Sequence, residues 1–343
     1  MMNIQEFNVG IVGWGLYLPE NFISAEELSP QINTPPHIIR EKMGFDRKPV
    51  GGPEDHCVEM GTKAARQCLE KTGVDPKEID LVLWAGEDYK EYVCWTAGIA
   101  VQENIGAVNA WAFDVALRCA GTPLALKVAK DLMFANPDLN TVLVVGGNTN
   151  CYLVDYRCPE QSFMFDMAPG GLAMLLKRDW PENRILGSHV ITESSMHMDV
   201  IGAKGGSKNR LQAEDVENEG WKLIMPDPAG MKERLGAKSM LSFTGAVRGA
   251  LERSGLKEED IGYVCPVHIN PKAHKAILAE LGVDEDKGAY LQQYGHCGHA
   301  DQIIGLEMGL KEGKITDGTN IIFLGAGTGY AFSSTVIQWG KYK

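Results

Sequence analysis

Short apolar runs alternate with amphipathic stretches of helical length along most of this chain. Residues 64–72 place apolar side chains at helical spacing and stop at Gly73, and the apolar run 81–85 follows them. A second apolar run ends near residue 119, where another helical pattern begins (Leu124, Leu126, Val128, Ala129 and Leu132). Alternating strands and helices favour parallel-rich sheets with helices on both faces, so we predict an α/β fold.

The pattern contains an internal repeat. Residues 64–79 and 246–261 share Ala, Arg, Leu, Glu, Gly and Ile at matching positions, and an apolar strand follows each copy. A second repeated segment relates residues 140–147 to residues 320–327, and both are apolar runs that end in glycines. The repeat predicts two copies of one α/β domain, residues 1–177 and residues 178–343. We expect the two halves to share an interface and to build the functional site between them.

One segment, from Ser194 to Pro228, has weak periodicity and many polar residues. We interpret it as a long loop or cap, and loops of this length often contribute to function. Its basic residues Lys208 and Arg210, like Lys272 and Lys275 further on, could meet phosphates. The alternative is that they are solvated surface charges, which is their usual role.

The composition narrows the class of protein. The 343 residues carry a formal net charge of -12, which argues against nucleic acid as a partner. An acidic partner such as an acyl carrier protein would need a local basic patch. No run of about 18 apolar residues and no basic, apolar leader are visible, so we expect neither a membrane segment nor a secretory signal. The eight cysteines follow no regular spacing, which favours a reduced, cytoplasmic location.

The first candidate for chemistry is Cys119, at the junction between a predicted strand and a predicted helix. A thiol there sits at the positive end of the helix dipole, which favours the nucleophilic thiolate. Gly121 allows a substrate carbonyl to approach the backbone closely. The alternative is an inert buried cysteine, which is the commoner role for this residue type.

Two histidine motifs in the second half favour catalysis at Cys119. His268 follows an apolar strand in Cys265-Pro-Val-His268, and His296 lies in Gln293-Tyr-Gly-His296-Cys-Gly-His299. A thiolate and two imidazoles can take up an acyl group as a thioester and then stabilise an enolate. Each histidine alone is more often structural. A zinc site is a further alternative, although the H-C-x-H spacing matches no standard zinc pattern. The residues considered for it are Cys265, His268, His296, Cys297 and His299.

A glycine-rich loop, Gly325-Ala-Gly327-Thr328-Gly329-Tyr330, ends the last of the paired apolar runs. Its glycines permit a tight turn. A backbone N–H from Gly327 or Thr328 can also join the Cys119 N–H as an oxyanion hole. The loop is not a dinucleotide-binding motif, because no βαβ unit follows it.

Together these motifs resemble a known family. The D-x-A-x-x-C-A-G setting of Cys119, the opening Gly10-Ile-Val-Gly13-Trp-Gly15 and the loop before Tyr330 are similar to the ketoacyl-acyl-carrier-protein synthase III group of the thiolase superfamily. The resemblance covers nearly the whole chain. It implies a thiolase-like fold, with two duplicated βαβ-type halves in five α-β-α-β-α layers, a homodimer and a pantetheine tunnel. It also implies that Cys119 takes an acyl group from coenzyme A and that His268 assists condensation with a malonyl thioester.

Three departures from the family pattern concern the site. His296 replaces the family's asparagine, and the resulting Cys-His-His set resembles that of the elongating ketosynthases. His268-Ile-Asn270-Pro271 replaces a His-Gln-Ala-Asn motif, an arginine expected at Ala273 is absent, and Ile38 aligns with a tryptophan that stacks on adenine in some members. Glu87 lies in a setting that resembles the Ala-Thr-Glu motif of hydroxymethylglutaryl-coenzyme A synthases, whose glutamate is a general acid/base. The alternative for Glu87 is a solvated carboxylate at a strand end.

The sequence therefore predicts an acyltransferase that forms an acyl-Cys119 thioester and condenses it, decarboxylatively, with a malonyl thioester to a 3-oxoacyl product. The predicted catalytic residues are Cys119, His268, His296 and Glu87, with Gly327 and Thr328 in the oxyanion loop and Asn270 and Lys272 binding substrate. Acyl-CoA is expected as a substrate, with no resident cofactor or metal, and a homodimer and an acyl carrier protein are the expected partners. Two alternatives stay open: condensation without decarboxylation that uses Glu87, and a non-catalytic homologue that binds acyl groups.

Overall fold

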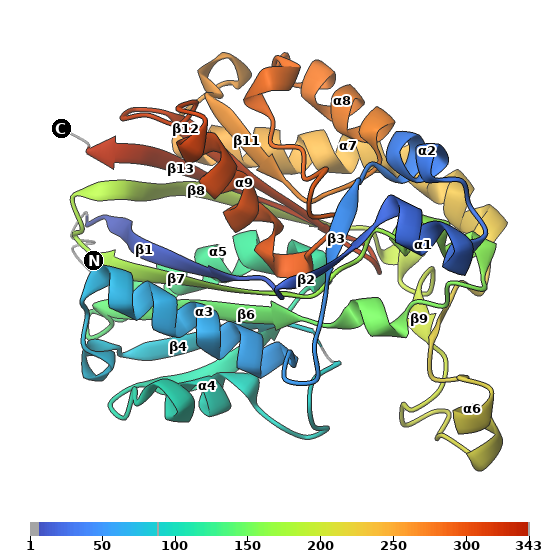
Figure 1. Ribbon diagram of the computed structural model, residues 1–343. Helices are drawn as coiled ribbons and strands as arrows, with labels where there is room; N and C mark the ends of the chain where they lie inside the picture. Colours follow the sequence, from blue (N-terminus) through green and yellow to red (C-terminus); the bar gives the residue numbers. More distant parts are fainter. Residues whose placement is uncertain (1–6, 88, 342–343) are drawn as a thin grey trace.

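The sheet of this protein is built from two halves, and four strands of each follow the same order (Figure 1). The computed structural model describes residues 7–87 and 89–341. Within these residues, nine strands form one mixed sheet in the order β11-β12-β13-β8-β1-β7-β6-β4-β5. Their bounds are β1 (Val9–Tyr17), β4 (Leu81–Gly86), β5 (Trp111–Ala116), β6 (Thr141–Asn148), β7 (Gly170–Arg178), β8 (Glu182–Thr192), β11 (Tyr263–Pro266), β12 (Asn320–Gly327) and β13 (Ala331–Lys341). β5, at the edge of the first half, has no counterpart among the described strands of the second.

The pairing pattern repeats between the halves. β4 runs parallel to β6, and β7 runs antiparallel to β6 and to β1. In the second half β11 runs parallel to β12, and β13 runs antiparallel to β12 and to β8. The halves join where β1 meets β8, and one residue pair, Gly10 with Arg184, connects them among the described strands. The boundary at residues 177 and 178 falls at the end of β7 and stays a prediction.

Helices cover both faces of each half-sheet in five layers, as the sequence predicts. α3 (Cys57–Thr72) and α4 (Ala97–Ile105) lie on the outer face of the first half, and α7 (Pro228–Ser254) and α8 (Pro271–Glu280) on that of the second half. α5 (Gly121–Ala135) and α9 (Asp301–Lys311) lie between the half-sheets, and each contacts strands of both halves. One buried apolar cluster accordingly includes Leu83 and Met174 of the first half and Ile303 and Phe323 of the second.

The two repeated sequence segments form the ends of α3 and α7. Both helices end at a left-handed glycine, Gly73 with φ 67° and Gly255 with φ 69°, a conformation that glycine adopts without strain. Short turns, η2 (Pro76–Glu78) and η7 (Glu258–Asp260), then lead into β4 and β11. The sequence repeat therefore corresponds to a helix, a turn and a strand in each half.

Glycines set how closely α3 packs on the first half-sheet. A Cβ at Gly15, Gly147 or Gly171 would overlap backbone atoms of α3. The missing side chains let the helix lie directly on β1, β6 and β7. This close packing places the first turn of α3 beside the carboxyl end of β6.

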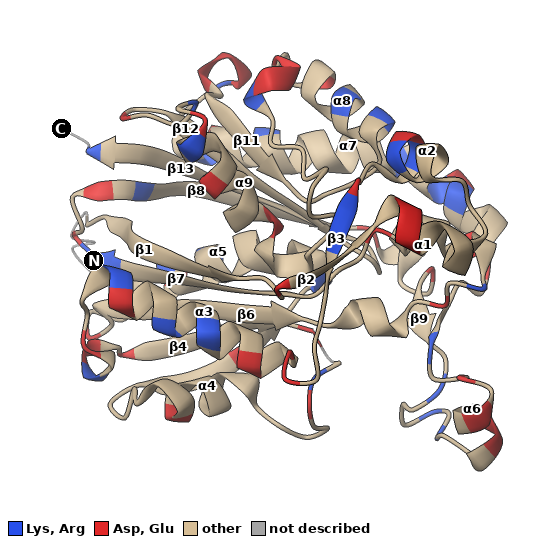
Figure 2. Cartoon of the chain, in the orientation of Figure 1, with Lys and Arg blue, Asp and Glu red and all other residues tan. Residues whose placement is uncertain are grey.

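Excursions from the layered core surround the carboxyl ends of the central strands. The N-terminal excursion contains β2 (Asn21–Ser24), α1 (Ala25–Ile32), α2 (Pro36–Ile38), η1 (Ile39–Met43) and β3 (Arg47–Val50). The segment predicted as a loop or cap contains short elements: η6 (Ser194–Met196), β9 (Ile201–Gly202), α6 (Ala213–Glu217) and β10 (Leu223–Ile224). α6 projects away from the layers, at the lower right of Figure 1, and basic residues precede it in Figure 2. Further short turns are η3 (Arg118–Ala120), η4 (Asn150–Leu153), η5 (Pro159–Met164), η8 (Glu285–Lys287) and η9 (Gly298–Ala300).

Both excursions contribute to a separate apolar cluster beside the layers. Leu28 and Phe45 from the N-terminal excursion pack in it with Phe165, and Val200 and Met225 join them from the cap segment. This cluster forms one side of the cavity described below. No helix among residues 7–87 and 89–341 is long and apolar enough to cross a membrane.

Candidate active site

Cys119 lies where the sequence places it, between β5 and α5. A short turn, η3 (Arg118–Ala120), follows β5, and α5 begins at Gly121. Arg118 has φ 50°, a left-handed conformation that is uncommon for a side chain other than glycine and often marks a functional turn. The turn directs the Cys119 thiol, 8% exposed, toward a cavity at the N-terminal end of α5.

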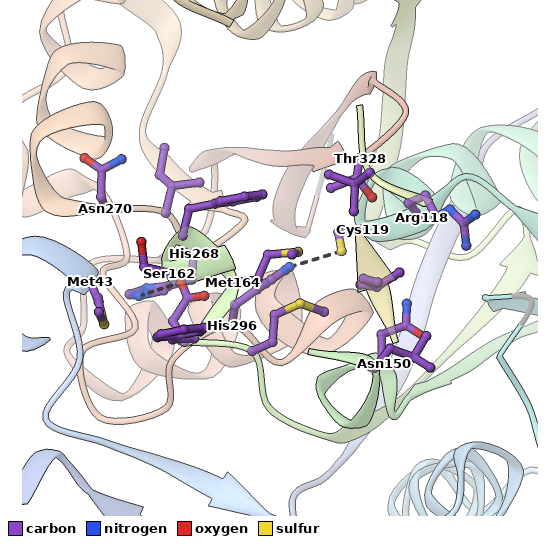
Figure 3. A pocket seen from close by; sticks show the side chains of 18 of the residues that line it. Met43, Arg118, Cys119, Asn150, Ser162, Met164, His268, Asn270, His296 and Thr328 are labelled. Atoms are coloured by element: carbon purple, nitrogen blue, oxygen red, sulfur yellow. Dashed lines mark hydrogen bonds and ion pairs between the residues drawn. The ribbon is translucent and has the colours of Figure 1, made fainter. Parts of the chain in front are cut away.

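His296 faces Cys119 from the other half (Figure 3). Its Nε2 lies 3.1 Å from the Cys119 Sγ, and its Nδ1 lies 2.6 Å from the Oδ2 of Asp301. Gly295, with φ 63°, positions this loop, because a Cβ there would strike the Asp166 carbonyl. Burial alone would lower the pKa of His296, but Asp301 and Cys119 raise it well above its usual value. His296 is therefore held as an imidazolium whose Nε2 faces the sulfur of Cys119.

Asp301 connects the two histidine loops. It is the first residue of α9 and is fully buried. Its Oδ2 accepts a hydrogen bond from the backbone N–H of His268 (2.7 Å), and its Oδ1 accepts one from the N–H of Cys297 (2.7 Å). A carboxylate at a helix N-terminus is also stabilised by the helix dipole. Asp301 thus holds both predicted catalytic histidines in position.

His268 follows β11 and is buried in the same cavity. Burial lowers the pKa of His268 to about 4, so its imidazole is neutral at pH 7. Neither ring nitrogen has a hydrogen bond within the described part of the chain, and Nε2 lies 3.7 Å from the Oδ2 of Asp166. Burial raises the pKa of Asp166 to about 6. A neutral imidazole with a free donor suits hydrogen bonding to a substrate carbonyl.

Glu87 follows β4 and lies inside the protein, 3% exposed, so the alternative of a solvated carboxylate is wrong. Its Oε2 accepts a hydrogen bond from Arg118 (3.1 Å), and its Oε1 lies 3.4 Å from the Nε2 of His299. Burial would raise the pKa of Glu87, but His299 and Arg118 lower it below its usual value. Glu87 lines the same cavity as Cys119, as an ionised carboxylate.

The glycine-rich loop adjoins the nucleophile. β12 ends at Gly327, and a Cβ at that position would lie 3.0 Å from the backbone nitrogen of Cys119. Thr328 follows and lines the cavity beside Cys119 in Figure 3. Gly327 and Thr328 therefore adjoin the nucleophile, and their part in an oxyanion hole stays a prediction.

The two predicted substrate-binding residues differ in position. The Oδ1 of Asn270 accepts the N–H of Ala273 and so caps α8, while Asn270 also lines the cavity. Lys272 is exposed and does not line it. Within the described residues, no group of three or more His, Cys, Asp or Glu side chains is arranged to hold a metal ion, so the five residues considered for zinc form no such site.

The cavity has a volume of about 1230 Å³, and Cys119, His268 and His296 all line it. Apolar side chains from both excursions, from the segment between β6 and β7 and from α7 form much of its wall: Ile38, Met43, Met164, Phe165, Met167, Val200, Leu223 and Leu235. Four basic residues, Lys42, Arg118, Arg157 and Lys204, also line it. Its size and apolar character suit a pocket for an acyl chain and its thioester carrier.

Sequence reasoning missed Asp301, Asp166 and Lys48. Lys48 is buried, and its ammonium donates to the carbonyls of Phe165 (2.6 Å) and Met167 (2.7 Å), which fixes the segment that carries Asp166. Asp301 lies two residues after His299, in the second histidine motif. A carboxylate at the start of the predicted helix there could have identified it from the sequence. Asp166 and Lys48 have no local signal, because tertiary packing alone brings them to the site.

Comparison with known proteins shows which family the chain resembles. Residues 113–194 match the family model 3-oxoacyl-[acyl-carrier-protein] synthase III, and residues 251–339 match the model of its C-terminal part. The β-ketoacyl-[acyl-carrier-protein] synthase III of Caldanaerobacter subterraneus subsp. tengcongensis is 28% identical over 338 residues, 98% of this chain and 99% of that protein. The enzyme of that name from Clostridium tetani is 29% identical over 96% of this chain and 98% of its own.

Solved structures share the fold. The 3-oxoacyl-[acyl-carrier-protein] synthase III of Aquifex aeolicus superimposes with a TM-score of 0.82 at 22% identity, over 96% of this chain and 100% of that one. Xanthomonas campestris OleA, solved with bound lauric acid and lauroyl-CoA, has a TM-score of 0.80 at 18% identity, over 97% of this chain and 99% of its own. The fold is that of the thiolase superfamily of condensing enzymes. Within it, the chain resembles the 3-oxoacyl-[acyl-carrier-protein] synthase III family, to which both family models and the curated relatives belong.

Proposed function

We propose that this chain forms an acyl-Cys119 thioester and condenses it, with loss of CO2, with a malonyl thioester to give a 3-oxoacyl product. One observation carries the proposal: Cys119 is within 3.1 Å of His296 at the end of a cavity that His268 also lines. A nucleophile paired with a base is the requirement for covalent acyl transfer. Acyl-CoA is the proposed donor, and its coenzyme is a substrate rather than a resident cofactor.

In the first half-reaction the Cys119 thiolate attacks the carbonyl carbon of the acyl thioester. The oxyanion that forms accepts hydrogen bonds from the backbone N–H groups of Cys119 and Thr328, which lie at the same end of the cavity. The departing thiolate takes a proton from His296. The acyl group then remains on Cys119, and His296 is neutral.

In the second half-reaction His268 donates a hydrogen bond to the thioester carbonyl of the malonyl substrate. His296 donates a second one after its Nε2 has taken up a proton from water. Loss of CO2 leaves an enolate, whose charge these two donors stabilise. Its carbon attacks the acyl-Cys119 carbonyl, a C–C bond forms, and the Cys119 thiolate leaves. No protein base is needed for this step, because decarboxylation itself produces the carbanion.

Intact mass spectrometry with a panel of acyl-CoA thioesters tests the proposal. Cys119 should gain the acyl mass, and added malonyl thioester should release CO2 and remove the acyl group as a 3-oxoacyl product. Malonyl-CoA and malonyl acyl carrier protein, offered separately, identify the second carrier. A protein that gains no acyl mass from any donor would instead be the non-catalytic homologue.

A second enzyme function is supported by the burial of Glu87. Its ionised carboxylate lines the cavity near Cys119 and is held by Arg118 and His299, an arrangement that suits a general base. Such a base would remove a proton from an acetyl group and allow condensation without loss of CO2. Product formation without CO2 release would favour this alternative.

We also propose a cytoplasmic homodimer that meets an acyl carrier protein. β5 is an edge strand, and its Trp111 is 48% exposed and stacks on Phe113, so the strand offers an apolar edge for pairing with a second copy. Lys42, which lines the cavity, is the proposed contact for a phosphate-bearing carrier, because Arg157 is already paired with Asp155 and Glu219, and Lys204 with Asp215. The net charge of -12 argues against nucleic acid as a partner.

A further inference from the structure

Three side chains in the site form a hydrogen-bonded chain that the condensation does not fully use. The Cys119 Sγ lies 3.1 Å from the Nε2 of His296, whose Nδ1 lies 2.6 Å from the Oδ2 of Asp301. A nucleophile, an imidazole and a buried carboxylate in this order make a catalytic triad, which is recognised by geometry rather than by sequence position.

Asp301 fixes the orientation and the tautomer of the His296 imidazole. Two backbone N–H groups, from His268 and Cys297, hold its carboxylate, so it cannot rotate away from His296. The carboxylate keeps the proton of a neutral His296 on Nδ1 and leaves Nε2 as a proton acceptor toward Cys119. His268 has no such partner, because its Nε2 is 3.7 Å from Asp166. The site therefore contains one oriented base and one hydrogen-bond donor.

A condensation driven by loss of CO2 requires donors for an enolate and no base at the acyl-enzyme stage. A side-chain amide would meet that requirement at residue 296. An imidazole with a carboxylate behind it does more, since it can deprotonate a neutral nucleophile next to the acyl carbonyl. The base is thus available at the stage when decarboxylative condensation needs none.

We propose that acyl-Cys119 is also resolved by an oxygen nucleophile, either water or the hydroxyl group of an acceptor, which His296 deprotonates while Asp301 positions the imidazole. The result is acyl transfer to oxygen, an activity beyond the proposed condensation that depends on the same acyl-enzyme. His296 is the catalytic residue of this step, and Asp301 is a positioning residue.

The step balances in atoms and charge. After acylation His296 is neutral, because its proton has left with the thiol of the donor. Nε2 takes the proton of the O–H group, the oxygen attacks the acyl carbon, and the C–S bond breaks. The acid or ester leaves, and the thiolate of Cys119 and the imidazolium of His296 are restored. No oxidant, reductant or further co-reactant is required.

The cavity has room for the acceptor. About 1230 Å³ is more than a short acyl group occupies, and polar side chains of Asn150, Ser162 and Asn270 line it together with apolar ones. These groups can hydrogen-bond a hydroxyl-bearing acceptor.

The decay of the acyl-enzyme tests the proposal independently of how fast it forms. Acetyl-Cys119 is prepared with acetyl-CoA, freed of donor, and followed by intact mass in H2¹⁸O, with and without butanol as a hydroxyl probe. We expect decay on the order of 10²-fold faster in the wild type than in His296→Asn. Acetate with one ¹⁸O identifies water as the acceptor, and butyl acetate identifies a hydroxyl group. Equal decay rates of the two proteins under both conditions would overturn the proposal.

His56→Asn is the matched control, because His56 is exposed and does not line the cavity. It should decay like the wild type. Asp301→Asn adds a measurement that distinguishes a loss of positioning from a structural defect. The rate of acyl-enzyme decay rises with pH as His296 loses its proton, and the pH at half-maximal rate should be lower in this variant, because Asp301 raises the pKa of His296. A structural defect would lower the rate without shifting that pH. Asp166, His268 and Cys119 also face His296 and are unchanged in this variant. Malonyl condensation is measured on the same acyl-enzyme, so that the two proposals can fail independently. An acyl-enzyme that decays through His296 but does not condense with a malonyl thioester would refute the proposed function and support transfer to oxygen.

Discussion

At the scale of single residues, the surroundings of each ionisable group determine its pKa and therefore the role it can play in the reaction. Burial raises the pKa of the Cys57 and Cys68 thiols to about 12, whereas Cys119 has an imidazolium 3.1 Å away. His268 and His296 are both buried, yet their pKa values move in opposite directions because Asp301 bonds to one ring and only to the backbone of the other. Two histidines of one site can therefore serve as a neutral donor and a base.

Cys119 should react with limiting iodoacetamide faster than the buried cysteines, because its sulfur lies 3.1 Å from the His296 ring, and a neighbouring imidazolium favours the reactive thiolate. Exposed Cys94 serves as the internal reference in peptide mapping. We expect His296→Asn to slow labelling of Cys119 on the order of tenfold relative to Cys94. If Cys57 or Cys297 is labelled first, Cys119 is not the nucleophile.

Variants at residue 296 should separate hydrogen bonding from base catalysis. An asparagine can still donate one hydrogen bond to a thioester carbonyl, so His296→Asn should keep part of the malonyl decarboxylation. His296→Ala removes the donor and should lose on the order of 10²-fold or more. The measurement is CO2 release from a malonyl thioester on preformed acyl-enzyme. An alanine variant as active as the wild type would remove His296 from the site.

Glu87 divides the two condensing functions. If CO2 loss generates the carbanion, Glu87→Gln should leave acylation and condensation nearly intact, because glutamine fills the same space beside Arg118 and His299. If Glu87 is the base, condensation should fall roughly 10²–10⁴-fold while acylation persists. Exchange of the acetyl methyl protons for deuterium in acyl-enzyme, present in the wild type and lost in the variant, would contradict the decarboxylative proposal.

At the scale of elements, the regular pattern was predictable and the irregular excursions were not. Strand and helix periodicity located β4, α3 and the junction at Cys119, because each buries a face whose spacing the sequence records. The contribution of Lys48 and Asp166 could not be predicted, since β3 and the 165–167 segment meet the site only through long-range packing. The burial of Glu87 likewise depends on Arg118 and His299, which lie far from it in sequence.

α8 contributes an acid-sensitive element outside the catalytic chain. His274 on this helix is buried against Tyr290, and burial lowers its pKa to about 4. His274 binds a proton more tightly in the unfolded chain than in the folded protein. The free energy of unfolding is therefore highest above pH 6.5 and falls as the pH drops toward 4. At pH 5 this one group lowers the free energy of unfolding by about 2 kcal/mol relative to neutral pH.

His274→Gln cannot take up the proton and should therefore lose less stability than the wild type between pH 7 and pH 5. Urea unfolding at the two pH values measures the difference, and His56→Gln at an exposed site is the control. An equal loss in all three proteins would show that His274 is not the acid-sensitive group.

At the scale of the whole molecule, the duplicated halves divide the work. The first half supplies Cys119 and Glu87, and the second supplies His268, His296 and Asp301, so the site exists only where the halves meet. Pairing of β5 with a second copy would extend the sheet beyond its present edge.

Trp111→Lys should weaken the proposed dimer. A charge on the apolar edge strand opposes pairing, and Trp111 is exposed in the single chain, so the fold itself should tolerate the change. Sedimentation velocity across a range of protein concentrations measures the effect, with Trp221→Lys in the cap segment as a comparison. A wild-type protein that stays monomeric at every concentration would refute the dimer.

The seam between β1 and β8 has a consequence for how the chain can be made. One residue pair joins the two half-sheets, whereas the apolar layer between them includes side chains from both. A polypeptide cut between β7 and β8 would lose almost no ladder hydrogen bonds but would expose that layer on each piece. Two separately synthesised fragments should therefore be insoluble or unfolded alone and should reconstitute an active enzyme when mixed.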